Sequence, residues 1–180
     1  MYSNAGTLPC IHKGHLVPAE TYSFSDDHIR STFTYTNAVP QYATFNTGQW
    51  SSHERMIRDY AKDICSTKNL GDLYLLTGIS NRRIRFTPKN NIKAVVRPLI
   101  QMPEPPYIVI PNSMWTAGCC VSINGKHVHG SFAVIGNNDP RKEKIRMSQV
   151  TVKTLTSLLR VTDLFPGKPG CSEDKNDVTI

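Results

Sequence analysis

The sequence lacks any long apolar run. No stretch approaches the roughly 18 consecutive apolar residues needed to cross a bilayer, and the first ten residues lack the charged and then apolar layout of a signal peptide. Internal repeats, heptads and low-complexity tracts are also missing, which excludes solenoids and coiled coils. We therefore expect a soluble chain without a membrane segment, folded as one compact unit, because 180 residues with 39% hydrophobic content can form one sizeable core.

Cysteine is scarce, and its spacing is irregular. The five cysteines are Cys10, Cys65, Cys119, Cys120 and Cys171. They match neither paired CxxC zinc knuckles nor a small disulfide scaffold, so metal binding by cysteine is not expected. Two bridges with one leftover thiol would suit a secreted domain, whereas five buried thiols would suit the cytosol. The sequence alone leaves both possibilities open.

Acidic residues are fewer than basic ones. The chain has 21 Lys and Arg against 14 Asp and Glu, which gives a formal net charge of +7. This balance favours polyanionic partners such as nucleic acid or acidic membrane surfaces. A basic cluster can be a solvated face or part of a groove that follows phosphates. Two such clusters stand out, one of Arg82, Arg83 and Arg85 and one of Arg141, Lys142, Lys144 and Arg146.

Periodicity and turn residues predict mixed strands and two helices, that is, an α+β fold. Apolar residues at helical spacing predict a helix over residues 48–64, and a second helix is expected to begin with Ser148 as its N-cap and to run to residue 159. Residues 98–106 are rich in proline and are expected to form a connector. Strands are expected over 31–35 with an end at 37–40, over 73–77 as a buried strand, over 107–110, and over 121–123 and 127–134 as a hairpin with a tight primed turn at 124–125.

The last residues differ from the rest in composition. Residues 166–180 are polar and rich in glycine and proline. We therefore expect a domain over 1–165 followed by a tail over 166–180, and the tail should be loosely held unless Cys171 is bridged back to the body.

One segment offers every type of group that phosphodiester cleavage requires. The reaction needs a base to activate water, a cation on the phosphate and stabilisation of the leaving oxygen. The segment contains three short motifs, followed by Glu54 and Arg58. The motifs read His12-Lys13-Gly14-His15, Asn37-Ala38-Val39-Pro40-Gln41 and Asn46-Thr47-Gly48-Gln49-Trp50.

This ordered series resembles the DNA/RNA non-specific endonuclease family. The family pattern is Asp-Arg-Gly-His, then Asn-x-x-Pro-Gln, then Asn-x-Gly-x-Trp with a Glu and an Arg downstream. Within the family, residues 35–41, 73–78 and 115–120 look most like the endonuclease domain-containing 1 protein group. The resemblance covers roughly residues 10–165. It implies a ββα-metal (His-Me finger) fold with a mixed or antiparallel sheet and packed helices, and metal-dependent, sequence-nonspecific cleavage of DNA or RNA to 5′-phosphate products.

The resemblance also implies roles for the central residues of the site. His15 would be the general base, because a neutral imidazole can take a proton from water near pH 7. Asn46 would be the one direct protein ligand of Mg²⁺, or of another divalent cation such as Mn²⁺, since Mg²⁺ keeps most of its water shell. Glu54 would hold that water, and Arg58 would be within reach of this carboxylate and of a phosphate oxygen.

Three further residues are carried over as substrate-binding or bracing groups. Lys13 would contact phosphate, and Asn37 and Gln41 would brace the site or touch the nucleic-acid backbone. By analogy with the family group we also expect an extracellular protein, nucleic acid as partner and a homodimer. The sequence does not choose between DNA and RNA.

Each of these residues also has an ordinary structural interpretation. His15 alone would be a surface or core-edge histidine, and Asn46 alone would be a helix N-cap. Glu54 and Arg58 alone would form a helix-surface ion pair worth about 0.3–0.5 kcal/mol. His127 and His129 alternate on one strand face and could be a metal pair, although no third ligand is evident in the sequence.

The sequence departs from the family pattern in two ways. His12 and Lys13 replace the Asp and Arg before Gly-His, so a bracing carboxylate is lost, and phosphate loses a bidentate partner. His12, three positions before His15, is expected to point elsewhere than the base. The family also has a substantial stretch before the histidine motif, so we expect an N-terminally truncated sheet with an exposed apolar edge.

Three functions remain open at this point. The first is a working metal-dependent nuclease. The second is a nonenzymatic nucleic-acid-binding or interaction module with the same fold. The third is a secreted structural domain whose basic charge serves acidic glycans.

Overall fold

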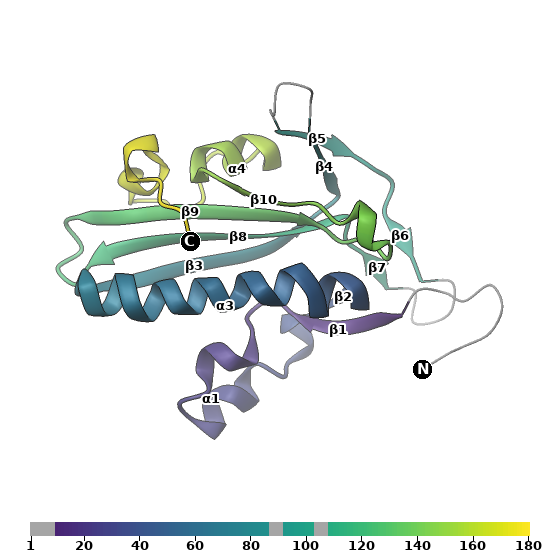
Figure 1. The fold of residues 1–180 in the computed structure, drawn as a ribbon, viewed down its shortest axis with the longest axis horizontal. Coiled ribbons are helices and arrows are strands. Elements are labelled where there is room, and N and C mark those ends of the chain that lie inside the picture. Colours follow the sequence, from purple (N-terminus) through teal and green to yellow (C-terminus); the bar gives the residue numbers. More distant parts are fainter. Residues whose placement is uncertain (1–9, 87–91, 103–107) are drawn as a thin grey trace.

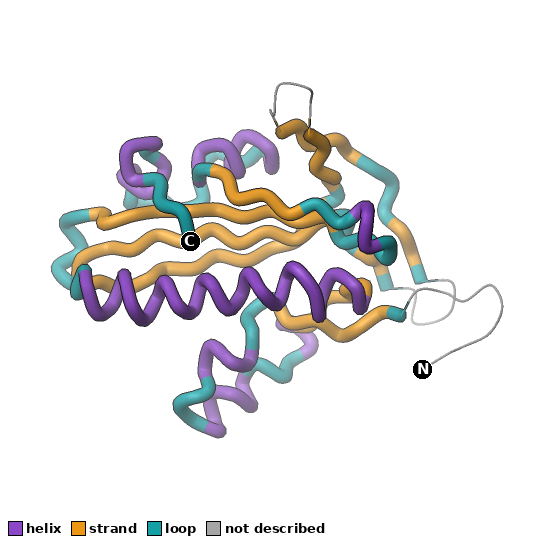
Figure 2. The backbone as a smooth tube through the Cα atoms, viewed as in Figure 1, coloured by secondary structure: helices purple, strands orange, loops and turns teal. Residues whose placement is uncertain are grey.

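The computed structural model describes residues 10–86, 92–102 and 108–180. Within these ranges a four-stranded sheet in the order β10-β9-β8-β3 forms the centre of the molecule, and its strands are antiparallel (Figures 1 and 2). Three smaller antiparallel pairs join β1 to β2, β4 to β5 and β6 to β7. No helix in these ranges is long and apolar enough to cross a membrane. The strands are β1 Ile11–His15, β2 Ala38–Tyr42, β3 Gly71–Ser80, β4 Arg82–Phe86, β5 Ile92–Val96, β6 Ile100–Gln101, β7 Val109–Ile110, β8 Ser113–Ser122, β9 Val128–Asn137 and β10 Met147–Val150, and the α-helices are α1 Asp26–Ser31, α2 Ala43–Phe45, α3 Ser51–Asp59 and α4 Val152–Leu159.

The predicted hairpin is confirmed as β8 and β9, but its turn differs from the prediction. A type I′ turn needs positive φ at both central residues and a type II′ turn needs it at the first. Of Asn124 and Gly125, only the second, Gly125, has a positive φ, at 71°. Five residues, 123–127, connect the strands instead. The Gly125 N–H donates to the Ser122 carbonyl at 2.7 Å, and the Asn124 side chain accepts from the Lys126 N–H at 3.0 Å. A side chain therefore stabilises a longer loop here.

The predicted strand over 73–77 is part of β3, but it is not buried. The β3 side chains Tyr74, Leu75, Leu76 and Ile79 are all exposed. Among the described strands β3 pairs only with β8, so it forms an edge of the sheet. An apolar run without alternation is typical of a strand that is covered on both faces. Here the run lies in an edge strand, and its apolar side chains are exposed. Among the described residues β3 thus leaves an exposed apolar edge, and whether this edge arises from a truncated sheet stays a prediction.

The prediction for residues 31–40 was wrong. The aromatic stretch over 31–35 is no strand, since α1 ends at Ser31 and a 3-10 turn occupies Tyr35–Asn37. The strand is β2, which contains the very proline expected to end it. Pro40 lies opposite Lys13 in a two-stranded pair, where a missing N–H disrupts little. Phe33 is 67% exposed, so these aromatic residues do not serve the core.

The helix predicted over 48–64 is confirmed, with different ends. Helical turns run over 43–68, as α2, a segment Asn46–Trp50, α3 and a π-helical segment Tyr60–Lys68, with a kink at Gly48, whose φ of −103° and ψ of −117° are not helical. This long helix lies along one face of the sheet (Figure 1), where Ile57 and Tyr60 pack against Phe132. A disulfide between Cys65 and Cys120 ties it to β8.

The second helix, α4, packs against the other face of the sheet. Val152 and Leu155 lie in one buried cluster with Ala133 and Ile135 of β9. Ser148 is not its N-cap, because that residue belongs to β10. Thr151 caps the helix, and its hydroxyl accepts a hydrogen bond from the Thr154 N–H at 3.0 Å. Residues 147–150 were not predicted as a strand, because the helical pattern begins directly after them.

The C-terminal segment is attached to the body by a disulfide between Cys171 and Cys119. Beyond the bridge, the Val178 N–H donates to the Ser131 carbonyl at 2.9 Å. The tail was expected to be loosely held unless Cys171 is bridged back to the body, and this bridge is present. With Cys65 paired to Cys120 and Cys10 left as an exposed free thiol, two bridges plus one thiol is the arrangement found.

The proline-rich connector is more ordered than expected in its first half. Ile100–Gln101 forms β6 and pairs with β7, Val109–Ile110. The predicted strand over 107–110 is thus confirmed at its end, and residue 107 lies outside the described residues.

Candidate active site

The strands β1 and β2 and the start of the long helix form a ββα unit. In the register of the two strands, His12 lies opposite Gln41. The chain leaves β2 and enters the helix at once, and the Ala43 N–H donates to the Cys10 carbonyl at 2.9 Å. This connection places the first helical turn beside β1. As a result, His12 Nδ1 lies 3.1 Å from Asn46 Nδ2, although 34 positions separate the two residues.

The contact with His12 orients the carboxamide of Asn46. When the Asn46 amide N–H donates, His12 Nδ1 accepts, and the imidazole proton resides on Nε2. The Asn46 Oδ1 atom is then left for another partner. The interpretation of Asn46 as a simple helix N-cap is wrong, because its backbone is already helical, with φ −60° and ψ −50°. His12 thus contacts Asn46 through an imidazole, at the position where the family pattern has a carboxylate.

Gln41 is fully buried between the two motif histidines of β1. Its side chain lies over Gly14, where an added Cβ would come within 2.1 Å of the Gln41 Cδ atom. Only glycine fits there. The Gln41 amide donates to the His15 carbonyl at 3.3 Å, while its Oε1 atom is buried and has no hydrogen-bond partner among the described residues. A buried acceptor without a donor is a place where ordered water or a hydrated cation would be stabilising.

His15 lies at the end of β1 and contacts a different group from His12. Its ring packs edge to face on Phe33, with 5.0 Å between the ring centroids. Residues three apart on a strand point to opposite faces, so the prediction that the two histidines point apart agrees with their contacts. No hydrogen bond within the described chain joins His15 to Asn46. Lys13, between the histidines, is exposed.

Asn37 fixes the segment that follows His15. Its Oδ1 accepts from the Val17 N–H at 2.8 Å, and its amide donates to the Val17 and Thr32 carbonyls at 3.0 and 2.8 Å. The Leu16 N–H also donates to the Asn37 carbonyl. Because the side-chain amide is engaged within the chain, this geometry favours bracing over contact with a substrate.

Arg58 forms its ion pair with Glu20, a residue that the sequence did not single out. The Arg58 Nη2 atom lies 2.5 Å from the Glu20 carboxylate. The expected surface ion pair between Glu54 and Arg58 is therefore replaced, although Arg58 still lowers the pKa of Glu54 through its charge. Glu20 belongs to a 3-10 turn, Ala19–Tyr22, shortly after β1. The signal that could have indicated Glu20 is its position in the sequence, since it is an acidic residue close to the histidine motif.

Burial raises the pKa of Glu54 to about 7. The nearby indole N–H of Trp50 and the charge of Arg58 lower it, and the charge of Glu20 raises it again. The Trp50 N–H is close to Glu54 but falls short of a regular hydrogen bond. Burial makes the Glu54 carboxyl group costly to ionise, and a nearby cation would lower this cost.

The donor chemistry around Asn46 fits a hydrated divalent cation better than a cation caged by side chains. Among the described residues no three His, Cys, Asp or Glu side chains gather in one place. His127 and His129 pack edge to face, with 4.8 Å between ring centroids, and no third such ligand joins them in this part of the chain. A neutral amide oxygen with an unsatisfied acceptor nearby suits Mg²⁺, which binds through few protein ligands and keeps several waters.

Comparisons with known proteins identify the class to which this ββα unit belongs. The family described as DNA/RNA non-specific endonuclease matches residues 1–169. The chain therefore belongs to this family. A similar solved structure comes from the crystal structure of the EndoG/EndoGI complex, reported for the mechanism of EndoG inhibition. The TM-score is 0.62 at 18% sequence identity.

The alignment with that structure covers 86% of this chain but 58% of the other. The chain thus spans somewhat more than half of the length of its structural neighbour. At this identity the likeness shows the fold alone, and the α+β fold of this chain is that of the nuclease. No curated protein matches the sequence.

Proposed function

We propose that this protein is a metal-dependent, sequence-nonspecific endonuclease that hydrolyses phosphodiester bonds of DNA or RNA at its ββα unit. The observation that carries the proposal is the contact between His12 and Asn46. It places an oriented carboxamide at the head of the helix, beside the strand that ends in His15. Membership of the endonuclease family supports the same reaction.

In the proposed mechanism His15 is the general base and takes a proton from the attacking water. Asn46 presents its Oδ1 atom to Mg²⁺ or a similar cation such as Mn²⁺, and His12 keeps that atom in place. When bound, the cation supplies Lewis acidity that offsets the negative charge developing on the phosphate and the leaving oxygen. Glu54, once ionised, accepts hydrogen bonds from the surrounding water.

The remaining residues position these groups or the substrate. Lys13 is exposed and supplies positive charge beside His15. Arg58 supplies a second cation, which Glu20 orients and partly neutralises. Asn37 and Gln41 hold the loop after β1 and the backbone of His15, respectively. Their hydrogen bonds and the burial of Gln41 support a bracing role rather than direct contact with the nucleic acid.

We also propose an extracellular location, which the two disulfides support, because such bridges persist in oxidising compartments. The homodimer expected from the resemblance stays a prediction that sedimentation velocity can test. Parallel assays with DNA and RNA substrates will establish the preference between them.

A plasmid-nicking assay tests the proposed function. Supercoiled plasmid is incubated with the chain in Mg²⁺, in Mn²⁺ and in EDTA, and with His15→Ala and Asn46→Ala. The matched control is His127→Ala, an exposed histidine in the β8–β9 loop. Nicking that requires the metal, survives in the control and is lost in both site variants supports the enzyme. Nucleic-acid binding without any nicking would instead identify a binding module with the nuclease fold, and binding of heparin alone would identify a domain for acidic glycans.

A further inference from the structure

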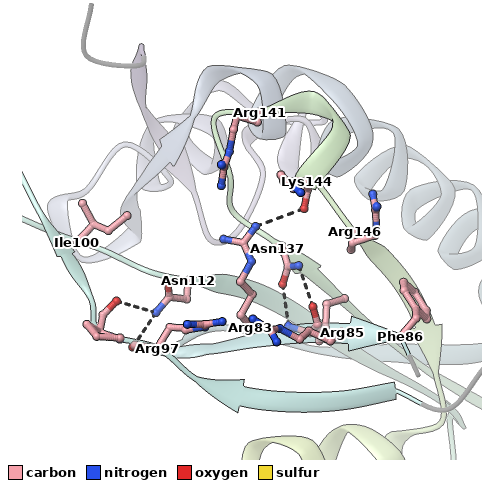
Figure 3. A pocket seen from close by; sticks show the side chains of 12 residues that line it. Arg83, Arg85, Phe86, Arg97, Ile100, Asn112, Asn137, Arg141, Lys144 and Arg146 are labelled. Carbon is pink, nitrogen blue, oxygen red and sulfur yellow. Dashed lines mark hydrogen bonds between the residues drawn. The ribbon is translucent and has the colours of Figure 1, made fainter. Parts of the chain in front are cut away.

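The two basic clusters of the sequence meet in one cavity of about 840 Å³. Nearly sixty residues separate them along the chain, and Arg97 joins them from a third segment. Figure 3 shows Arg83 and Arg97 rising from one wall, Arg141 and Lys144 approaching from the opposite wall, Ile100 at one end and Phe86 with Arg146 at the other. We name this cavity the basic pocket. Its charged lining residues are Arg83, Arg85, Arg97, Arg141, Lys144 and Arg146.

The basic pocket lies across the sheet from the ββα unit. Ile84, which lines it, belongs to the buried cluster that packs under α4. On β9, Asn137 lines the basic pocket, whereas an added Cβ on the preceding Gly136 would meet Phe45 of α2. Successive residues of a strand point to opposite faces. In Figure 1, β4 and β5 accordingly lie on the α4 side of the sheet and the long helix on the other. The basic pocket is thus a second site.

Buried polar side chains fix the walls of the basic pocket. Asn137 is 1% exposed and binds Ile84 of β4 twice, accepting from its N–H at 2.8 Å and donating to its carbonyl at 3.0 Å. Asn112 donates to the Arg97 carbonyl at 3.0 Å and so holds the third segment. Asp139, also 1% exposed, pairs with both Arg83 and Arg141. A merely solvated basic face would not need such buried bracing.

The basic pocket keeps a large excess of positive charge. Asp139 offsets only one of the two arginines it binds. Although burial alone would raise its pKa, the hydrogen bonds from Arg141 and Arg83 lower it, so it stays ionised. In the described part of the chain, the four lining cations that take part in no ion pair with a carboxylate are Arg85, Arg97, Lys144 and Arg146. These cations are available to an anionic ligand.

The lining also indicates which anion fits. Five of the six cations are arginines, whose planar fork matches phosphate and stacks on flat groups. Phe86 is 47% exposed and Ile100 is 52% exposed, so the two ends offer apolar contact between charged walls. Charge that follows a phosphate backbone, combined with an exposed aromatic ring, is how proteins bind single strands. An acidic glycan would use the charge and leave the ring without a role.

We propose that the basic pocket binds a single-stranded segment of nucleic acid, with its phosphates on Arg85, Arg97 and Arg146 and a base against Phe86. The basic pocket would hold the same molecule that the ββα unit cleaves, and in that respect the inference rests on the proposed function. Binding itself needs neither metal nor cleavage. Its test can therefore be kept apart from the nuclease assay.

Fluorescence anisotropy in EDTA tests the proposal with a labelled twelve-nucleotide single strand of mixed sequence, and heparin serves as a second probe. The variants are Arg85→Gln with Arg97→Gln, and Phe86→Ala. The matched control, Lys62→Gln with Lys126→Gln, removes the same charge from exposed positions outside the basic pocket. All changed side chains are exposed, and a thermal melt checks that each variant is folded.

We expect the double arginine variant to weaken single-strand binding about tenfold or more relative to the control. The slope of log K against log salt should fall by about 1.4, or about 0.7 for each lost phosphate contact. Phe86→Ala should weaken binding of the single strand about fivefold or more and leave heparin binding unchanged.

Two results would overturn the proposal. In the first, both pocket variants bind the single strand as the control does. In the second, the arginine variant weakens heparin and the single strand alike while Phe86→Ala changes neither, which would identify a site for acidic glycans. Failure of the proposed nuclease function is a separate outcome. It shows as absence of metal-dependent nicking by the unaltered chain, whatever the anisotropy result.

Discussion

His12 and Asn46 are held 3.1 Å apart, nitrogen to nitrogen, by the step from β2 into the long helix. In the family pattern the position of His12 carries an aspartate, so an imidazole takes the place of a carboxylate beside the proposed cation ligand, Asn46. His12 contacts Asn46, but a side chain without a negative charge attracts a cation less strongly than a carboxylate does. Two substitutions at His12 should therefore affect cation binding differently.

Removing His12 should weaken cation binding. We expect His12→Ala to lower the affinity for Mn²⁺ about tenfold to a hundredfold, because the group that orients the ligand is lost. His12→Asp should bind the cation at least as tightly as the unaltered chain, because it adds a negative charge. Titration followed by electron paramagnetic resonance of free Mn²⁺ measures both, and His127→Ala is the control. Equal affinities in all four proteins would show that His12 does not act on Asn46.

Gly14 is predicted to be irreplaceable because Gln41 occupies the space of a side chain. Gly14→Ala should lower the free energy of unfolding by about 1–3 kcal/mol through overpacking. The matched control is the same change in a Gln41→Ala background, where the space is free. There its effect should be close to zero. Urea unfolding of the four proteins gives the coupling, and an equal cost in both backgrounds would contradict the proposed clash.

The elements that sequence patterns predicted well are those with strong local signals. The long helix followed from its apolar spacing, and the β8–β9 hairpin from two strand-like runs around Asn124-Gly125. The failures occurred where tertiary pairing decided the structure. Pro40 lies inside β2 because β1 pairs with it, and the apolar strand β3 lies at an edge because no described strand pairs with its other side.

The sequence suggested members of the candidate site, which stay predictions, but it did not indicate their contacts. The motifs named His15, Asn46 and Glu54 through a resemblance. No local pattern indicates that His12 contacts Asn46 or that Arg58 pairs with Glu20, because these contacts depend on how β1 packs beside the helix. The basic pocket shows the same limit, since its clusters were visible in the sequence and their convergence was not.

Glu54 and His53 are neighbours with opposite effects on stability as pH changes. Burial raises the pKa of Glu54 to about 7 and lowers the pKa of His53 to about 4. The folded chain therefore keeps the Glu54 proton that the unfolded chain releases, and stability from this residue is lost as pH rises from about 4.5 to 7. Between about pH 4 and 6.5 the unfolded chain binds a proton at His53 that the folded chain does not bind. The stability that His53 contributes is therefore lost as pH falls from about 6.5 to 4.

Single variants should separate these two effects. In metal-free buffer, Glu54→Gln should leave the His53 effect alone, so stability rises by about 3 kcal/mol between pH 4 and 6.5. His53→Gln should leave the Glu54 effect alone, so stability falls by a similar amount between pH 4.5 and 7. Urea unfolding at each pH measures both slopes. Slopes of the same sign in the two variants would contradict the assignment.

The cysteines should react in a defined ratio. Alkylation of the folded chain without reductant is expected to modify Cys10 alone, and alkylation after unfolding and reduction should modify all five cysteines. Intact mass measures both counts. Replacing Cys171 with serine should release the segment after α4, because that bridge ties it to β8, and limited proteolysis should then cut it faster. More than one adduct before reduction would refute the pairing.

We propose that the imidazole of His15 acts as the base at this ββα unit. The most direct test of this proposal is the nicking rate of His15→Ala in Mg²⁺, measured with and without added imidazole. We predict a loss of about 10²- to 10⁴-fold without imidazole, and a partial recovery that grows with the concentration of the neutral form of the added base. A His15→Ala chain that nicks plasmid as fast as the unaltered protein would contradict the account.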